Sequence, residues 1–296
     1  MSKNRLLFLS IAVLLLLLLI SCNSKTPGLI LTCGWDEITI TDISKEVPEK
    51  VWNWKAENSQ GLPLFMRNKF QTTDECKSIN NGKQILVTSS GGGVALVEQS
   101  GGSTLFYASV PNAHSAEYLP GNFIAVASSF SPLGNRINLY SLDKPDLVVD
   151  SDSLYGAHGL VWDKKRKTLW ALGTYELRSY SLSGGEEPSL KFIRSMELPD
   201  PDGHDLCVLD NKNELCLSTG NHVWLYNIKE DSFTKHPVLG DEARVKSLSY
   251  NSLDGSTAYI KATEENWWAY YIRFAGSKKV IYLPGQKLYK ARWVYN

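Results

Sequence analysis

The feature of this sequence that most constrains its fold is a pattern of short strands that recurs six times. Runs of alternating or β-branched residues come roughly every ten residues after residue 22, and Gly, Asn, Asp and Ser separate them. One strand of each repeat reads, in chain order, ILTC, ILVT, IAVA, LWAL, LCLS and AYIK, starting at Ile30, Ile85, Ile124, Leu169, Leu215 and Ala258. Each is followed by a small or polar loop and a second strand, so the repeating unit holds several strands.

A further strand precedes the one named above in every repeat. In chain order, it begins at Lys77, His114, His158, His204, Lys246 and Lys290. Four-stranded units spaced about 40 to 50 residues apart are typical of β-propeller blades. The sixth copy ends after one strand, so the strands between Ile30 and Trp54 are expected to complete it. We therefore predict an all-β, six-bladed β-propeller over residues 29–296, closed by its C-terminal innermost strand and three N-terminal strands, which hides the sheet edges.

The first residues predict a signal peptide. Lys3 and Arg5 precede an apolar run from Leu6 to Ile20, which is interrupted only by Ser10. This run is shorter than the roughly 20 residues that cross a bilayer. We assign residues 1–21 to a signal peptide.

The end of that segment, Leu19-Ile20-Ser21-Cys22, resembles a bacterial lipobox. The resemblance implies that Cys22 carries acyl chains such as palmitate, becomes the mature N-terminus and anchors the protein in a lipid bilayer. Residues 22–28 would then form a tether, and the expected location is the bacterial cell envelope at the outer membrane. The alternative is an ordinary signal peptide with a chance cysteine at this position.

The charge balance excludes nucleic-acid coating as the main activity. The chain has 31 Lys and Arg against 31 Asp and Glu, whereas coating needs a basic excess. Of the other cysteines, Cys207 and Cys216 could face each other across a hairpin, while Cys33 and Cys76 are harder to place. Disulfides and buried free thiols both remain open for these four.

The six residues that begin the innermost strands are expected to surround one mouth of the axial channel. Arg136 and Tyr175 should reach the same face from other loops, and Arg292 follows in the last strand. Three Lys and three His around one axis would repel each other, which favours an anionic ligand between them, such as an acidic glycan. The alternative is a structural ion-pair network, because many Asp and Glu residues lie on the same loops.

His114, His158 and His204 could also serve as catalytic or metal-binding residues. Three imidazoles from successive blades can hold a divalent metal, although nothing in the sequence requires one. The arrangement resembles oligogalacturonate lyase, a seven-bladed propeller, without sharing any linear motif with it. By that resemblance a neutral His would remove a proton from the sugar, and Lys246, Lys290 or Arg292 would neutralise the uronate carboxylate.

Lipobox and blade pattern together make the chain similar to bacterial lipid-anchored, single-domain six-bladed propellers, most of which are uncharacterised. Our first functional hypothesis is a monomeric lipoprotein that binds an anionic glycan or a small acidic ligand at the mouth. The second is a polysaccharide lyase or a glycan-processing hydrolase at the same site. The third is a scaffold that binds other proteins through its outer loops.

Overall fold

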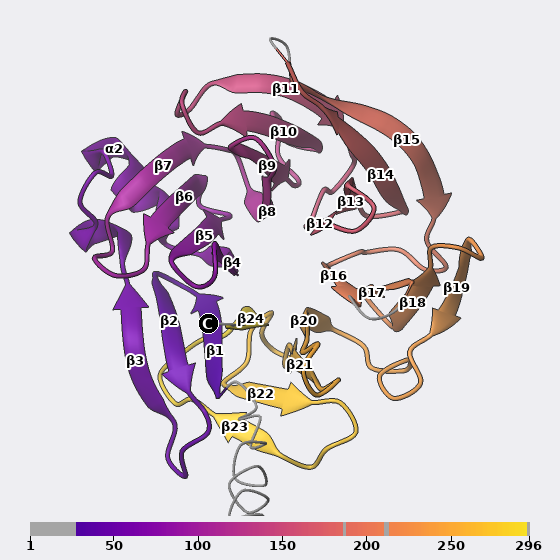
Figure 1. Cartoon of the computed structure of the whole chain (residues 1–296). Helices are drawn as coiled ribbons and strands as arrows, with labels where there is room; N and C mark the ends of the chain where they lie inside the picture. The colour runs from indigo at the N-terminus through magenta and orange to yellow at the C-terminus, as the bar shows by residue number, and fades with distance from the viewer. Residues whose placement is uncertain (1–27, 186–187, 210–212, 295–296) are drawn as a thin grey trace, which may run out of the picture.

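The computed structural model describes residues 28–185, 188–209 and 213–294, in which six antiparallel four-stranded sheets surround one axis as blades (Figure 1). From the axis outward, the first blade holds β24 (Lys290–Trp293), β1 (Leu29–Gly34), β2 (Glu37–Asp42) and β3 (Glu49–Trp54). The second holds β4 (Thr73–Ile79), β5 (Gln84–Ser89), β6 (Gly93–Glu98) and β7 (Thr104–Ser109), and the third β8 (Ala113–Leu119), β9 (Phe123–Ser128), β10 (Arg136–Ser141) and β11 (Val148–Ser153).

The fourth blade holds β12 (Gly159–Asp163), β13 (Thr168–Leu172), β14 (Glu176–Ser183) and β15 (Ser189–Glu197). The fifth holds β16 (Asp205–Leu209), β17 (Glu214–Ser218), β18 (Val223–Asn227) and β19 (Ser232–Lys235), and the sixth β20 (Val245–Tyr250), β21 (Thr257–Lys261), β22 (Tyr271–Phe274) and β23 (Val280–Tyr282). The predicted six-bladed propeller is therefore confirmed. The predicted signal peptide and Cys22 lie outside the described residues.

The ring closes as the sequence predicts. The last strand, β24, pairs antiparallel with β1, with Ile30 opposite Trp293 and Thr32 opposite Ala291. The first blade is thus built from both ends of the chain, and β24 lies beside the N-terminal strands in Figure 1.

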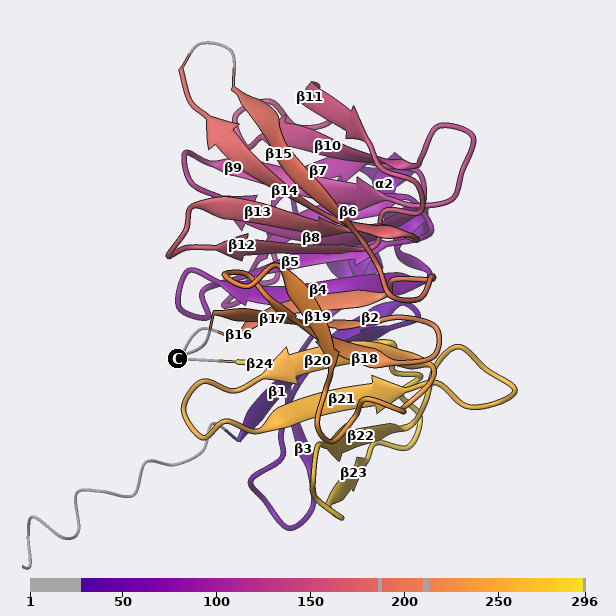
Figure 2. The ribbon, with the colours of Figure 1, turned by 90° about the vertical axis from the view of Figure 1, so that its right-hand side faces the viewer.

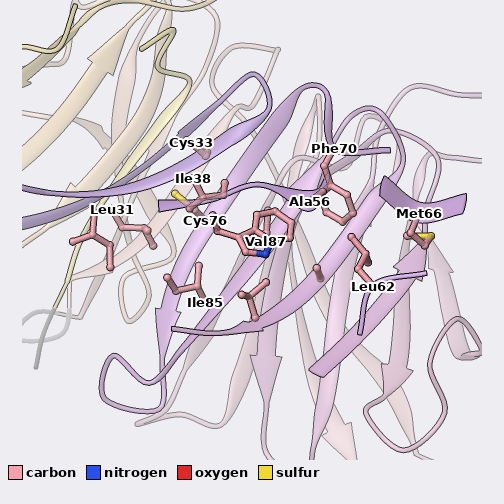
Figure 3. Packing of buried hydrophobic residues seen from close by; sticks show 14 of the residues in the cluster. Leu31, Cys33, Ile38, Ala56, Leu62, Met66, Phe70, Cys76, Ile85 and Val87 are labelled. Carbon is pink, nitrogen blue, oxygen red and sulfur yellow. The ribbon is translucent and has the colours of Figure 1, made fainter. Parts of the chain in front are cut away.

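Apolar layers between neighbouring blades hold the ring together. Figure 3 shows the layer between the first and second blades, where Leu31 and Ile38 pack against Ile85 and Val87. All four side chains are fully buried, because each strand presents one face to the next blade. Packing of blade on blade therefore fixes the positions of the innermost strands that form the mouths.

One departure from the strand pattern lies between the first two blades. Residues there form two short 3-10 turns, η1 (Ala56–Asn58) and η2 (Asn68–Phe70), and a single helical turn, α2 (Leu64–Arg67). Met66 and Phe70 are buried against the layer in Figure 3, so tertiary packing stabilises a turn too short to give a helical period in the sequence.

The innermost strands do not all start in the same way. In β4, β8 and β20 the register with the second strand shifts by one residue near the start. Such a β-bulge inserts one residue and bends the strand. These bulges decide which side chain of each strand reaches the mouth.

The described cysteines are all free thiols. Cys207 and Cys216 lie directly opposite each other in β16 and β17, as predicted, and Cys33 and Cys76 are buried in the same apolar layer. Within the described part of the chain, every helix is too short to cross a bilayer.

Candidate functional site

One mouth of the axial channel is formed by six aligned residues, one from each blade. The main-chain N–H groups of His158, His204 and Tyr289 each donate to the end of the second strand in their blade, at 2.8 to 2.9 Å. The bulges place Asp74, His114 and Lys246 at the matching positions of β4, β8 and β20. We call this set the histidine mouth: Asp74, His114, His158, His204, Lys246 and Tyr289.

The positions predicted for Lys77 and Lys290 are wrong. Asp74, not Lys77, aligns with His114, and Tyr289, not Lys290, aligns with His204. The comparison of the six repeats matched basic residues with one another and did not allow for the bulge in β4. The interval from Lys77 to His114 is shorter than the intervals between the other strand starts, and counting from Asp74 makes it more similar to them. This short interval was the sign in the sequence that Lys77 had been misaligned.

The imidazoles of the histidine mouth pack on one another. The ring centres of His114 and His158 are 4.3 Å apart, and those of His158 and His204 are 5.3 Å apart, both edge to face. Nδ1 of His158 lies 2.9 Å from the carbonyl oxygen of Gly156, so this nitrogen carries the proton and donates. His158 and His204 are buried, and His114 is half-buried.

Burial keeps these imidazoles neutral. Burial lowers the pKa of His158 well below its usual value, and the neighbouring His114 and His204 lower it further. Burial also lowers the pKa of His114, although the charge of Asp74 opposes this shift. Neutral imidazoles at pH 7 can accept or relay a proton, which charged ones cannot.

Lys246 is the one lysine of the histidine mouth. Its Nζ lies 2.6 Å from Nε2 of His204, which is also 3.1 Å from Oδ2 of Asp202. Burial lowers the pKa of Lys246 to about 8, and Arg244 and Lys290 add to this against the charge of Asp202. Lys246 is therefore a cation at neutral pH that loses its proton readily.

The sequence also suggested the three histidines as a possible metal site. Among the described residues, no three His, Cys, Asp or Glu side chains are arranged to hold a metal ion. The rings of His114 and His204 each meet that of His158 edge to face, and Nε2 of His204 lies next to Lys246 and Asp202. The metal hypothesis stays a prediction from the sequence.

Lys290 and Arg292 belong to a buried ion cluster deeper on the axis. Arg292 bridges Glu75 and Asp205 through four contacts of 2.7 to 3.0 Å, and Nζ of Lys290 lies 3.0 Å from Asp205. Glu75 and Asp205 come from β4 and β16, which face each other across the ring (Figure 1). We call these four residues the axial ion cluster, and it separates the two ends of the channel.

The axial ion cluster balances its own charges. Burial would raise the pKa of Asp205, but Arg292 and Lys290 outweigh it and hold this pKa below its usual value. Glu75 behaves in the same way. Two cations and two carboxylates thus neutralise each other, so the ion-pair alternative is confirmed for Lys290 and Arg292.

The far end of the channel opens into a cavity of about 990 Å³, which we call the opposite mouth. All six innermost strands line it, and Lys77 lies on its wall, where Nζ is 2.6 Å from both Glu117 and the carbonyl oxygen of Leu160. Figure 2 shows the blades edge-on, and β24, whose Arg292 and Trp293 line the opposite mouth, is labelled toward the left of the picture. Lys77 thus lines the opposite mouth and does not join the imidazoles that the sequence placed beside it.

A continuous row of aromatic rings crosses the histidine mouth. On one side, Tyr175 stacks on Tyr155 at 5.8 Å, Tyr155 contacts Phe130 at 5.2 Å, and Phe130 lies 6.3 Å from His158. These three side chains are exposed by 45 to 58%. They form one aromatic wall of the mouth, and Arg136 begins β10 nearby, also exposed.

The second aromatic wall lies on the other side of the imidazoles. His114 is 6.4 Å from Tyr289, Tyr289 is 5.4 Å from Trp267, and Trp267 stacks on Trp35 at 5.1 Å. Nζ of Lys287 lies 4.0 Å from the centre of the Trp35 ring. The sequence indicated Tyr175 but missed Phe130, Tyr155 and Tyr289, because the loops that carry them follow no period.

Comparison with known families gives one match. Residues 35–296 match the model of DUF6528, described as a family of unknown function. No curated protein matches the chain. The match covers nearly the whole propeller, and the site must be interpreted from its own geometry.

Proposed function

The chain belongs to DUF6528, a family of unknown function, and we propose from its geometry that it binds acidic glycans across the histidine mouth. The observation that carries this proposal is the row of rings that runs from Trp35 to Tyr175 through the imidazoles. Exposed aromatic rings that flank a polar centre are typical of a binding site, because they offer apolar faces and hydrogen-bonding groups to the same ligand. A sugar ring presents its C–H face to such walls and its hydroxyl groups to the polar residues between them.

The polar centre suits an acidic sugar. Lys246 supplies a half-buried cation, and Arg136 supplies a second at the edge of one wall. A carboxylate on the sugar would pair with Lys246, since the neutral imidazoles beside it neither attract nor repel an anion strongly. Asp202, whose side chain is 54% exposed, would accept hydrogen bonds from the sugar hydroxyl groups.

The test is calorimetric titration with uronate oligosaccharides, using wild type and Tyr155→Ala/Tyr175→Ala. We expect the double variant to bind roughly tenfold or more weakly, because stacking on two rings is lost. The matched control is Tyr271→Ala/Tyr282→Ala, which removes a second stacked tyrosine pair on β22 and β23. Equal losses in both double variants, or binding to no uronate oligosaccharide, would refute the proposal and favour a protein-binding scaffold.

A second candidate activity is polysaccharide lyase chemistry at the same site. It is favoured by the 2.6 Å contact between Lys246 and His204, which places a neutral base beside a cation. In such a reaction Lys246 pairs with the uronate carboxylate and His204 takes the C5 proton through Nε2. The C4–O bond then breaks to give a C4–C5 double bond, and the leaving oxygen takes up a proton from water. Absorbance of that unsaturated product tests the activity, and binding without product would leave only the glycan-binding proposal.

Membrane anchoring through Cys22 completes the proposal. The first described strand, β1, begins at Leu29 beside Trp293, at the same end as the opposite mouth. A tether that reaches the propeller there would leave the histidine mouth facing away from the bilayer. Metabolic labelling with a palmitate analogue, which should be lost in Cys22→Ser, tests the anchor independently of glycan binding.

A further inference from the structure

The opposite mouth has the size and walls of a ligand site. Its volume of about 990 Å³ lies at the upper end of the range for small-molecule pockets. Four aromatic side chains line it, and three of them are half-buried and therefore open to a ligand. They are Tyr118, Trp162, Tyr250 and Trp293.

The charged side chains on the wall and floor of this cavity are paired. Lys77 is paired with Glu117, and Arg292, at the floor, is paired with Glu75 and Asp205. These pairs leave the cavity wall close to neutral.

Two further lysines remain unpaired. Lys164 and Lys167, on the turn between β12 and β13, also line the cavity and are exposed. Among the described residues, neither has a carboxylate within ion-pair distance. The cavity therefore has aromatic walls and an excess of positive charge at one side of its rim.

We propose that the opposite mouth is a second ligand site, which takes a planar ring compound that bears an acidic group. The ring would stack between Trp162 and Tyr250, which come from β12 and β20 on the cavity wall. The acidic group would lie at the rim with Lys164 and Lys167, because the cations deeper in the cavity already have carboxylate partners. A carboxylate, sulfonate or phosphate shares this chemistry.

This site works independently of the histidine mouth. The axial ion cluster lies between them, and Arg292 and Lys290 are held there by Glu75 and Asp205 at 2.7 to 3.4 Å. A ligand in one mouth therefore does not touch the residues of the other. The two proposals can fail separately.

The test uses two fluorescent probes that differ by one acidic group. 8-Anilinonaphthalene-1-sulfonate has two aromatic ring systems and a sulfonate, and N-phenyl-1-naphthylamine lacks the sulfonate. We expect the sulfonate to bind the folded protein at a single site, and the neutral probe to bind at least tenfold more weakly. Near-UV circular dichroism of each sample verifies that the protein is folded, since partly unfolded proteins also bind the sulfonate.

Matched variants locate the probe. Lys164→Glu/Lys167→Glu should weaken sulfonate binding at least tenfold, whereas Lys165→Glu/Lys144→Glu changes the net charge equally at exposed positions that do not line the cavity. We expect less than a twofold effect from the second pair. Equal effects of the two pairs, or equal binding of both probes, would overturn the proposal.

The variant Tyr155→Ala/Tyr175→Ala provides the remaining control. It removes one aromatic wall of the histidine mouth and should leave sulfonate binding unchanged. If sulfonate binding is lost in this variant but kept in Lys164→Glu/Lys167→Glu, the probe occupies the histidine mouth and the second site is refuted. Loss of uronate binding in the tyrosine variant tests only the first proposal.

Discussion

Replacing Arg292 with alanine should destabilise the propeller more than any exposed charge substitution. The guanidinium makes four contacts of 2.7 to 3.0 Å with Glu75 and Asp205, and a fifth of 2.9 Å with the carbonyl oxygen of Leu248. Both carboxylates are 1% exposed, so the variant leaves two buried negative charges whose remaining cations are Lys290, which pairs with both, and Lys77, which lies 3.9 Å from Glu75. Removing one partner of a buried ion pair costs about 3–5 kcal/mol.

This loss is measurable by thermal and chemical unfolding. For a domain of this size, about 3–5 kcal/mol corresponds to a decrease in Tm of roughly 6–20 °C. Lys50→Ala is the matched control, because Nζ of Lys50 lies 2.9 Å from Glu37 in a pair that is 42% and 22% exposed. We expect the control to lose no more than about 1 kcal/mol. Arg292→Lys should fall between wild type and Arg292→Ala, since lysine keeps the charge but cannot bridge two carboxylates.

The pH dependence gives the result that would refute this reasoning. In wild type, Arg292 and Lys290 hold the pKa values of Glu75 and Asp205 below their unfolded values, so this stabilisation is complete above pH about 4 and is lost as pH falls further. In Arg292→Ala, burial dominates and raises both pKa values, so the deficit should shrink as pH falls from 7 to 4. A deficit below about 1 kcal/mol at pH 7, or one that grows on acidification, would show that the cluster does not stabilise the ring.

Three further predictions concern the histidine mouth. Burial lowers the pKa of His158, so wild type loses stability as pH falls below the unfolded pKa of about 6.5. His158→Gln should therefore reduce the slope of the unfolding free energy against pH, between pH 7 and 5, by up to about 1.4 kcal/mol per pH unit. Urea unfolding at three pH values measures this slope, and an unchanged slope would contradict the prediction. At pH 8, cyanate should carbamylate Lys246 roughly tenfold faster than the exposed Lys165, because burial lowers the pKa of Lys246 to about 8. Peptide mass spectrometry compares the two carbamylation rates, and equal rates would place the pKa of Lys246 near that of an ordinary lysine. Gly34→Ala should lower the free energy of unfolding by about 1–3 kcal/mol, because the new Cβ would lie 1.7 Å from the carbonyl oxygen of Lys287, where the ring closes. Calorimetry that finds no change in stability would show that the loop carrying Lys287 moves freely.

The sequence predicted the fold because propeller blades repeat along the chain. Each blade is a local unit, so the strand starts at Ile85, Ile124, Leu169 and Leu215 were visible without any knowledge of contacts. Ring closure followed from counting strands at the two ends. The order and spacing of strands repeat along the chain, so a fold built from repeated units can be recognised from them.

The site was predictable only in part. His114, His158, His204 and Lys246 share the histidine mouth, as expected, because their blades are spaced regularly. Lys77 was misplaced because a single bulged residue in β4 moves every later side chain of that strand.

Contacts across the axis could not be predicted from the sequence. Glu75 and Arg292 are 217 positions apart and meet only after the ring has closed. The position of Phe130 and Tyr155 at the histidine mouth could not be predicted for a different reason: both lie on loops, and loop conformation does not repeat from blade to blade. A repeat pattern therefore predicts where blades lie, but it does not predict which charges pair between them.

The pairing of β24 with β1 also has a consequence for synthesis. The inner edge of β1 stays without its partner until residues 290–293 have been made, after every other blade has a complete set of strands. At about 5–20 residues per second, roughly 260 residues separate the two strands by about 13–50 s. During that time the first blade presents an open strand edge, which other chains could pair with. Shortening the chain before Lys290 would leave that edge open permanently, so truncated chains should aggregate.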